Sequence, residues 1–222
     1  MLRVRAITPI TVPPAELVRR QARYDRFSPA GVAVTLEDIG PDAPSALDTP
    51  DDIRVSDRLV AGMACATDPH DFDVVLPDCV LDPGVDAGST VPVVGMLRLS
   101  AGYAAALGPF GSMTRNAAIG DELTRRLVSY GLDGVHAGNA ILDLDFDAIA
   151  DDARWRAAIG AALDRLAVCG AVSVLNGCSA VELDGVDAGS PADRDPVPFD
   201  PARLALALLG AGRQAGLHPS RA

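Results

Sequence analysis

Residues Asp73–Gly84 read Asp-Val-Val-Leu-Pro-Asp-Cys-Val-Leu-Asp-Pro-Gly, an apolar run that stops at Cys79 and leads into turn residues. A short apolar run bounded by turn signals is typical of a buried strand. The pattern returns in residues 171–179, Ala-Val-Ser-Val-Leu-Asn-Gly-Cys-Ser, which stop at Cys178. Ligands bind at the carboxyl ends of strands in open parallel α/β sheets. The two stretches therefore predict two thiols that face one another across a cleft.

The composition predicts a globular chain with a substantial core, because 49% of the 222 residues are hydrophobic. The net charge of −11 argues against nucleic acid and anionic membrane surfaces as partners, since both need basic patches. No apolar run approaches the roughly 20 residues that cross a bilayer. The apolar stretch at the start of the chain is too short, and too interrupted by charged residues, for a signal peptide. We therefore expect a cytoplasmic location.

All 19 basic residues are arginines. A Schiff base to pyridoxal phosphate and a Walker A loop both require a lysine, so both are excluded. The four cysteines form no C-x-x-C pair, which argues against a zinc site, and a reducing cytosol argues against structural disulfides. We expect neither a metal nor a cofactor, and we expect Cys65 and Cys169 to be small buried hydrophobes.

Strand and helix patterns alternate in the first half of the chain. Alternating apolar residues and β-branched residues predict the strands. Pro14 marks the start of one helix, and acidic residues mark the start of another. The expected order is strand 2–7, helix 14–27, strand 31–36, helix 51–67, the strand that ends at Cys79, and strand 91–95. This order is typical of a parallel sheet with right-handed crossovers.

The second half repeats this order less clearly. We expect helix 97–107, a turn at 108–111 with little room for a strand before Thr114, helix 115–130, strand 134–144, helix 149–169, the strand that ends at Cys178, a loop at 184–200 and helix 201–210. No G-x-G-x-x-G follows the first strand, which disfavours dinucleotide binding.

Together these elements predict an α/β fold of two pseudo-twofold-related lobes, each a small parallel sheet flanked by helices. The active site would lie in the cleft between the lobes. We expect residues 1–95 and 200–222 to form the N-terminal lobe, with a returning C-terminal helix, and residues 96–199 to form the second lobe.

The positions of Cys79 and Cys178 suggest acid–base chemistry. Each follows a predicted strand, where the amides of a turn can lower a thiol pKa from its usual value of about 8.5. A thiolate on one face of a substrate and a thiol on the other can remove and return a proton next to a carbonyl without a cofactor. The alternative is two core thiols, because free cysteines are often buried.

The wider sequence resembles the Asp/Glu/hydantoin racemase superfamily, most closely its hydantoin racemase branch. Residues 72–86 are similar to its first cysteine motif, with Asp-Pro-Gly after the cysteine, and residues 91–95 to the strand that follows. Residues 141–144, Ile-Leu-Asp-Leu, and 176–179, Asn-Gly-Cys-Ser, are similar to two later motifs. The likeness runs from about residue 2 to residue 183 and so covers most of the chain.

The resemblance implies an isomerase that is independent of pyridoxal phosphate and metal, with Cys79 and Cys178 as the acid and base. It implies a racemase or epimerase acting on a small carbonyl or carboxylate compound, hydantoin-like or amino-acid-like, in a homo-oligomer. The substrate-binding residues would be Thr8, Ile10, Thr11, Val80, Thr114 and Ser179.

The first turn departs from the family. It reads Thr8-Pro9-Ile10-Thr11, where the family usually has Asn-Pro-Asn-Thr, so both amide side chains are replaced. The change suggests an altered and more apolar substrate. Two other functions stay open: a decarboxylase or cis–trans isomerase of the single-cysteine type on the same scaffold, and a non-catalytic protein that binds a small molecule.

Several polar residues have a structural as well as a functional interpretation. Ser179 either donates to a substrate or caps a helix. We expect Asp82 to cap its turn, Arg98 to be solvated, and His70 and His136 to lie on the surface. The series Asp143, Asp145 and Asp147 lacks the glycine and glutamate of a calcium loop, so we expect a solvated acidic turn.

Overall fold

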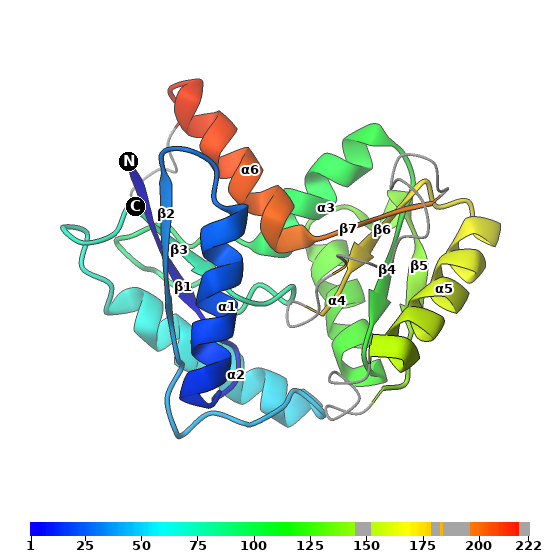
Figure 1. Ribbon diagram of the computed structural model, residues 1–222, viewed down its shortest axis with the longest axis horizontal. Coiled ribbons are helices and arrows are strands. Elements are labelled where there is room, and N and C mark those ends of the chain that lie inside the picture. The colour runs from blue at the N-terminus through cyan, green and yellow to red at the C-terminus, as the bar shows by residue number, and fades with distance from the viewer. Residues whose placement is uncertain (145–151, 179–182, 184–195, 218–222) are drawn as a thin grey trace. The chain divides into compact units, whose positions relative to one another are not determined.

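The computed structural model describes residues 1–144, 152–178, 183 and 196–217, and the chain divides into two compact units. Unit 1 comprises Met1–Leu99 and Ala202–Ala222, and unit 2 comprises Ser100–Pro201. The chain passes from one unit to the other within helix α3 (Met96–Leu107) and at the start of helix α6 (Pro201–Gln214). Figure 1 shows a sheet with flanking helices in each unit.

The sheet of unit 1 has three parallel strands in the order β2-β1-β3. Strands β1 (Leu2–Ile7), β2 (Val32–Glu37) and β3 (Val74–Pro77) are joined by helices α1 (Pro14–Phe27) and α2 (Pro50–Cys65). All four residues of β3 are buried, as expected for a strand covered on both faces. Apolar side chains of β1, β3 and α2 form one core, which contains Ile7, Val75, Val60 and Ala64.

The two helices of unit 1 begin at the signals that the sequence provides. Helix α1 starts with Pro14, and its limits are those predicted. Helix α2 starts after Thr49, whose side chain accepts from the amide of Asp52 while Asp52 accepts from the amide of Thr49. This reciprocal capping box fixes the start of α2 one residue before the predicted start.

The sheet of unit 2 has four parallel strands in the order β5-β4-β6-β7. Its strands are β4 (Phe110–Thr114), β5 (His136–Ile141), β6 (Ser173–Asn176) and β7 (Val197–Phe199). Helices α4 (Ala117–Ser129) and α5 (Asp152–Val168) connect them, with a short 3-10 helix at Asp133–Val135. Trp155, Ile159 and Leu163 of α5 pack on this sheet in the core of the unit.

The two units repeat one connectivity. In each, the first strand is central, the second strand lies on one side of it and the third on the other. Strands β1, β2 and β3 therefore correspond to β4, β5 and β6, and helices α1 and α2 to α4 and α5. This arrangement confirms the predicted fold class of two small parallel sheets flanked by helices.

Strand β4 corrects the predicted turn at 108–111. Phe110 and Gly111 belong to the strand, all five residues of which are buried. Gly111 packs closely against helix α5, because a Cβ there would lie 2.9 Å from Cδ2 of Leu166. The sequence pattern left only Ser112 and Met113 for this strand, because Gly111 and Ser112 interrupt the apolar run although both are buried in the centre of a sheet.

Two further segments differ from the prediction. Residues 197–199 lie in the predicted loop but form β7, because they pair with residues 173–175 of β6. Residues 91–95 form no strand and join the sheet only through the bridge between Val75 and Val93. The proline at position 92 has no amide hydrogen, which limits ladder pairing in this segment.

The expected burial of several side chains was also wrong. Cys65 and Cys169 are exposed, because both lie at the ends of helices rather than on their packed faces. His136 was expected on the surface but is half-buried at the start of β5, where its ring lies 5.3 Å from the ring of Phe110. Burial lowers the pKa of His136.

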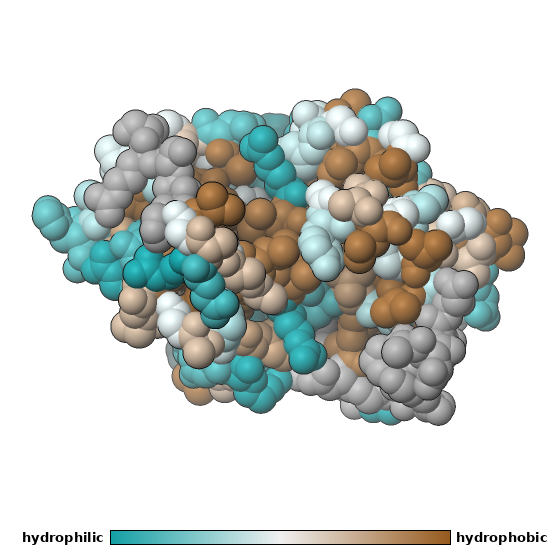
Figure 2. All heavy atoms as spheres, turned by 90° about the horizontal axis from the view of Figure 1, so that it is seen from above, coloured by the Kyte–Doolittle hydropathy of each residue, from teal (hydrophilic) through white to brown (hydrophobic). Residues whose placement is uncertain are grey.

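The surface mixes polar and apolar residues (Figure 2). Exposed apolar side chains include Val18, Leu107 and Val168, and scattered exposure of this kind is normal in globular proteins. Among the described residues, no helix has both the length and the apolar character needed to span a membrane.

Truncation of one α5 side chain tests the core of unit 2. Leu163 is 1% exposed and Val168, on the same helix, is 89% exposed. We expect Leu163→Ala to lower the free energy of unfolding by about 2–5 kcal/mol and Val168→Ala to change it by less than about 0.5 kcal/mol. Fluorescence of Trp155, the one tryptophan of the chain, would follow urea unfolding of this unit. Equal effects of the two substitutions would contradict this packing.

Candidate active site

Cys79 lies just beyond the carboxyl end of β3, in a buried turn. Ile7 of β1 pairs with Pro77 of β3, and the amide of Asp78 donates to the carbonyl of Ile7 at 2.8 Å. This bond holds the end of β3 against the end of β1, so Thr8 and Cys79 leave the sheet at the same edge. Cys79 and Val80 are both buried. We call residues 78–84 the Cys79 turn.

The sulfur of Cys79 accepts a hydrogen bond inside its own turn. The amide of Leu81 lies 3.4 Å from Sγ and points at it, and the amide of Asp82 donates to the carbonyl of Cys79 at 3.2 Å. An N–H directed at sulfur stabilises the thiolate relative to the thiol. The turn therefore favours the form of Cys79 that can remove a proton.

Asp82 anchors this turn to helix α3. Its backbone is in the left-handed region at φ 48°, and its buried carboxylate accepts from the amides of Leu97 and Arg98 at 2.8 and 2.9 Å. The carboxylate thus binds the first turn of α3, where the helix dipole favours negative charge. Gly95 leaves space for it, because a Cβ there would lie 2.2 Å from Oδ2 of Asp82.

The far side of the turn is held by helix α2. The amide of Gly84 donates to Oδ1 of Asp57 at 3.1 Å. Gly84 has φ +71°, and a Cβ at this position would lie 2.9 Å from the backbone nitrogen of Ala61. Only glycine fits this position without moving α2.

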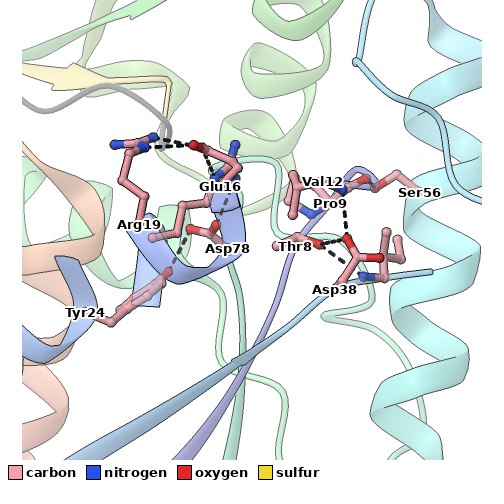
Figure 3. A network of polar contacts seen from close by, with 11 residues as sticks. Thr8, Pro9, Val12, Glu16, Arg19, Tyr24, Asp38, Ser56 and Asp78 are labelled. Atoms are coloured by element: carbon pink, nitrogen blue, oxygen red, sulfur yellow. Dashed lines mark hydrogen bonds and ion pairs between the residues drawn. The ribbon is translucent and has the colours of Figure 1, made fainter. Parts of the chain in front are cut away.

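The turn after β1 is organised by Asp38 (Figure 3). The Asp38 carboxylate accepts from the amides of Val12 and Gly40 at 2.8 and 2.9 Å, and from the hydroxyl of Thr8 at 3.4 Å. The Thr8 hydroxyl in turn accepts from the amide of Ile39 at 3.0 Å, and Ser56 donates to the carbonyl of Pro9 at 2.6 Å. Thr8 is fully buried, so its hydroxyl serves these internal bonds.

Ile10 and Thr11 follow in the same turn. Ile10 is buried and Thr11 is partly exposed, and the amide of Thr11 donates to the carbonyl of Pro44 at 3.0 Å. Thr8, Ile10, Thr11, Cys79 and Val80 therefore all lie at the carboxyl edge of the first sheet. Their roles toward a substrate stay predictions.

A buried ion pair joins helix α1 to the Cys79 turn. Figure 3 shows Glu16, Tyr24 and Asp78 around it. Asp78 accepts from Arg20 at 3.1 Å and from the Tyr24 hydroxyl at 2.7 Å, and Arg20 also donates to Glu16 at 2.7 Å. The side chains of Arg20 and Asp78 are 3% and 2% exposed. We call Glu16, Arg20, Tyr24 and Asp78 the Asp78 network. Both carboxylate oxygens of Asp78 are thus engaged, directly beside Cys79.

The charges in this network stabilise one another. Hydrogen bonds from Arg19 and Arg20 outweigh burial and lower the pKa of Glu16 to about 2. Burial alone would lower the pKa of Arg20, but Asp78 and Glu16 raise it above its ordinary value. Removing one member of such a pair leaves a buried charge without compensation, which typically costs about 3–5 kcal/mol.

Cys178 holds the corresponding position in unit 2. The amide of Gly177 donates to the carbonyl of Met113 at 2.8 Å, as the amide of Asp78 does to Ile7. The buried Asn176 side chain closes the turn: its Oδ1 accepts from the amide of Cys178, and its Nδ2 donates to the carbonyl of Cys178, both at 3.1 Å. Cys178 is partly exposed.

Thr114 ends the central strand of unit 2 beside this turn. A Cβ on Gly177 would lie 2.8 Å from Cγ2 of Thr114, so the two residues are in close contact. The Thr114 hydroxyl accepts from Nδ2 of Asn139 at 2.8 Å, and Ser112 donates to Oδ1 of Asn139 at 2.8 Å. Ser112 also lies 3.0 Å from Nε2 of His136. A chain of polar contacts thus runs through the sheet and fixes the Thr114 hydroxyl.

The structure brings the predicted residues together in two groups. One lies at the carboxyl edge of the first sheet, and the other, Thr114 with Cys178, at the carboxyl edge of the second. Ser179, Asp145 and Asp147 lie outside the described residues. Over the ranges that the structure describes, no three His, Cys, Asp or Glu side chains cluster as metal ligands would.

Sequence reasoning missed the Asp78 network and the Asn139 contacts. The signal for the first was present: residues 16–24 read Glu-Leu-Val-Arg-Arg-Gln-Ala-Arg-Tyr, and residues 122–130 read Glu-Leu-Thr-Arg-Arg-Leu-Val-Ser-Tyr. Glu, Leu, two Arg and Tyr recur at the same spacing. Recognition of this repeat would have placed a buried arginine, Arg20 in α1 and Arg126 in α4, on the inner face of both helices.

Comparison with known proteins identifies the fold. No protein-family model and no curated protein matches this sequence. The allantoin racemase of Pseudomonas fluorescens superposes with a TM-score of 0.81 and 17% identity, over 99% of this chain and 94% of that chain. The allantoin racemase of Klebsiella pneumoniae gives 0.81 and 19%, over 99% and 91%.

An aspartate racemase from Picrophilus torridus is more distant, with a TM-score of 0.61 and 14% identity over 99% of this chain and 96% of that chain. The chain therefore has the fold of the allantoin and aspartate racemases. This finding confirms, at the level of the fold, the predicted resemblance to the Asp/Glu/hydantoin racemase superfamily.

Substitution of Gly177 tests the Cys178 turn. A Cβ there would lie 2.5 Å from the carbonyl oxygen of Met113, whereas a Cβ on Gly160, in helix α5, would meet nothing within 4 Å. We expect Gly177→Ala to lower the free energy of unfolding by about 1–3 kcal/mol and Gly160→Ala to raise it by about 0.5–1 kcal/mol. Urea unfolding followed by Trp155 fluorescence checks both signs. A neutral Gly177→Ala would show that the turn is looser than described.

The low pKa of Glu16 predicts an acid-sensitive part of the stability. A carboxyl group with a depressed pKa contributes fully above its unfolded value of 4.5 and loses that contribution as the pH falls toward about 2. At neutral pH we expect Glu16→Gln to cost about 1 kcal/mol. The difference from wild type should shrink between pH 4.5 and about 2, as measured by urea unfolding with circular dichroism. A constant difference would rule out the charge as its cause.

Proposed function

We propose that this chain is a cofactor-independent racemase or epimerase of the Asp/Glu/hydantoin racemase type. One thiolate removes the proton from a carbon next to a carbonyl, and the other thiol delivers a proton to the opposite face. The observation that carries the proposal is the equivalent placement of Cys79 and Cys178. Cys79 follows β3 and Cys178 follows β6. These are corresponding strands in two units of the same connectivity.

The chemistry needs only groups that the chain supplies. When one sulfur takes the proton, the C–H bond breaks, an S–H bond forms and the electron pair passes into the carbonyl as an enolate. The enolate then takes a proton from the second thiol, whose S–H bond breaks, and the configuration of the carbon is inverted. The Leu81 amide at 3.4 Å from the Cys79 sulfur supports the thiolate form on one side.

The fold and the first turn support a proposal for the substrate class. Two similar structures are allantoin racemases, and allantoin is a substituted hydantoin whose ring carbon lies next to a carbonyl. We therefore propose a hydantoin-ring compound as substrate, with allantoin the first to test and aspartate the second. Ile10 gives the turn after β1 an apolar side chain, which favours a ring substituent less polar than an amino acid carboxylate.

Single cysteine substitutions test the proposal. We expect Cys79→Ser and Cys178→Ser each to reduce the racemisation rate of an enantiopure hydantoin at least about 100-fold, because each removes an acid–base group that the other cannot replace. Circular dichroism of the substrate measures the rate above the uncatalysed reaction. Cys65→Ser and Cys169→Ser, at exposed cysteines, are the matched controls and should keep full activity.

Other outcomes would overturn the assignment. If both active-site variants racemise the substrate at the wild-type rate, the thiols are not the acid and base. Release of carbon dioxide from a malonate-type substrate without racemisation would favour the decarboxylase alternative. Binding of a hydantoin without turnover by the wild type would favour the non-catalytic one.

A further inference from the structure

A row of polar side chains crosses the second sheet, from the start of β5 to the end of β4. Ser112 donates to Oδ1 of Asn139 at 2.8 Å, and Nδ2 of Asn139 donates to the Thr114 hydroxyl at 2.8 Å. His136 contacts the same serine, with 3.0 Å between Nε2 and Oγ. Ser112 and Thr114 are fully buried, and Asn139 and His136 are half-buried. We call these four residues the Asn139 row.

The hydrogens of this row run in one direction. The single proton of the Ser112 hydroxyl goes to Oδ1 of Asn139, an oxygen that only accepts. Nε2 of His136 must therefore donate to Ser112, so the ring carries a proton on that nitrogen. Burial lowers the pKa of His136, so the ring is neutral at pH 7 and Nε2–H is its one N–H group. With its oxygen committed to Ser112, the Asn139 amide turns its N–H toward Thr114.

The row fixes the orientation of the Thr114 side chain. The hydroxyl accepts from Asn139 at 2.8 Å, whereas its own proton reaches the carbonyl of Asn116 only at 3.3 Å, which is long for an O–H donor. The Asn139 bond is therefore the stronger of these two contacts. The methyl group of Thr114 points the other way, since a Cβ on Gly177 would lie 2.8 Å from Cγ2. A rotation about χ1 that broke the Asn139 bond would also move this methyl from Gly177.

Gly177 directly precedes Cys178 and is confined on two sides. Its amide donates to the carbonyl of Met113 at 2.8 Å, and the Thr114 methyl packs against it. A misplacement of a reacting group by about 1 Å can cost about 100-fold in rate. The Thr114 methyl thus links the Asn139 row to the placement of the thiol.

Helix α4 closes over the same hydrogen bond. Gly120 is buried, and a Cβ there would lie 2.5 Å from Nδ2 of Asn139 and 3.0 Å from Oγ1 of Thr114. A side chain at position 120 would therefore push the amide off the hydroxyl. Gly102 lies in helix α3 of the same unit, and a Cβ there would meet nothing within 4 Å. These two helical glycines form a matched pair for perturbing the row.

We propose that Asn139 is a positioning residue for Cys178, because it holds Thr114 in the orientation that packs the methyl against Gly177. The inference rests on the proposed function for its catalytic consequence. In this role Asn139 acts through Thr114 and moves no proton itself. Its loss would slow the proton transfer at Cys178 and leave substrate binding nearly unchanged.

Hydrogen exchange tests the structural link without any substrate. The amide of Gly177 is bonded to Met113 and the amide of Val172 to Pro109, both at 2.8 Å, at opposite ends of the same pair of strands. We expect Asn139→Ala to raise the exchange rate of the Gly177 amide about 3–10-fold, the effect of losing one hydrogen bond. The Val172 amide is the internal control and should keep its rate. NMR of the 15N-labelled full-length protein measures both.

A second variant covers the case in which Asn139→Ala does not fold. Gly120→Ala displaces only the end of the Asn139 side chain and should speed exchange at Gly177 in the same way, whereas Gly102→Ala should not. An unchanged Gly177 rate in the folded variants, or an equal rise at Val172, would overturn the inference. So would 15N ring shifts that place the proton of neutral His136 on Nδ1, because the row would then run in reverse.

Kinetics distinguish positioning from a general loss of stability. We expect Asn139→Ala and Thr114→Ala each to lower kcat for an enantiopure hydantoin about 10-fold or more, with KM changed less than about 3-fold. The double variant should be no slower than the slower single variant, because Asn139 acts through Thr114. Additive losses, or a change confined to KM, would contradict this role. The exchange rates need no turnover, so they separate a failure of this inference from a failure of the racemase proposal.

Discussion

One backbone hydrogen bond determines where each thiol of this protein lies. The amide of the residue before each cysteine donates to a carbonyl at the carboxyl end of the central strand, Asp78 to Ile7 and Gly177 to Met113. This hydrogen bond continues the pairing between the two strands by one residue past the end of the outer strand. The next residue, the cysteine, then leaves the sheet in a turn: the Leu81 amide donates to the Cys79 sulfur, and the Cys178 amide donates to the Asn176 side chain. Everything else near the sites serves to hold these two turns.

The two turns are held by different means. On the Cys79 side, α1 supplies Arg20 and Tyr24, α2 supplies Asp57, and Asp82 caps α3, so the turn is fixed from several directions. A buried ion pair is not by itself a strong source of stability, because desolvation offsets the attraction. Its value here is geometric: the carboxylate of Asp78 can lie in only one place. At the Cys178 turn, within the described part of the chain, the Asn176 side chain closes the turn within three residues.

The sequence predicted much of the fold but only part of the site. Alternation in residues 2–7 and Pro14 were sufficient for β1 and α1, and the apolar runs before Cys79 and Cys178 located both turns. Strand β4 was predicted too short because the burial of Gly111 and Ser112 depends on Leu166 and Asn139, which are distant in sequence. Asp78 lies within the first cysteine motif, but its partner Arg20 is 58 residues away in the sequence, and a local pattern cannot pair two such distant residues.

The proposed chemistry is tested most directly by the fate of the proton itself. One enantiomer of the substrate is incubated with the protein in deuterium oxide, and both enantiomers are analysed by mass spectrometry at low conversion. If two thiols act on opposite faces, the product carries deuterium delivered by the second thiol. The remaining substrate keeps its original proton, because the first thiol holds a single proton and can return only that one to the same face. Deuterium in the remaining substrate, or product that retains the original proton, would contradict the two-thiol account.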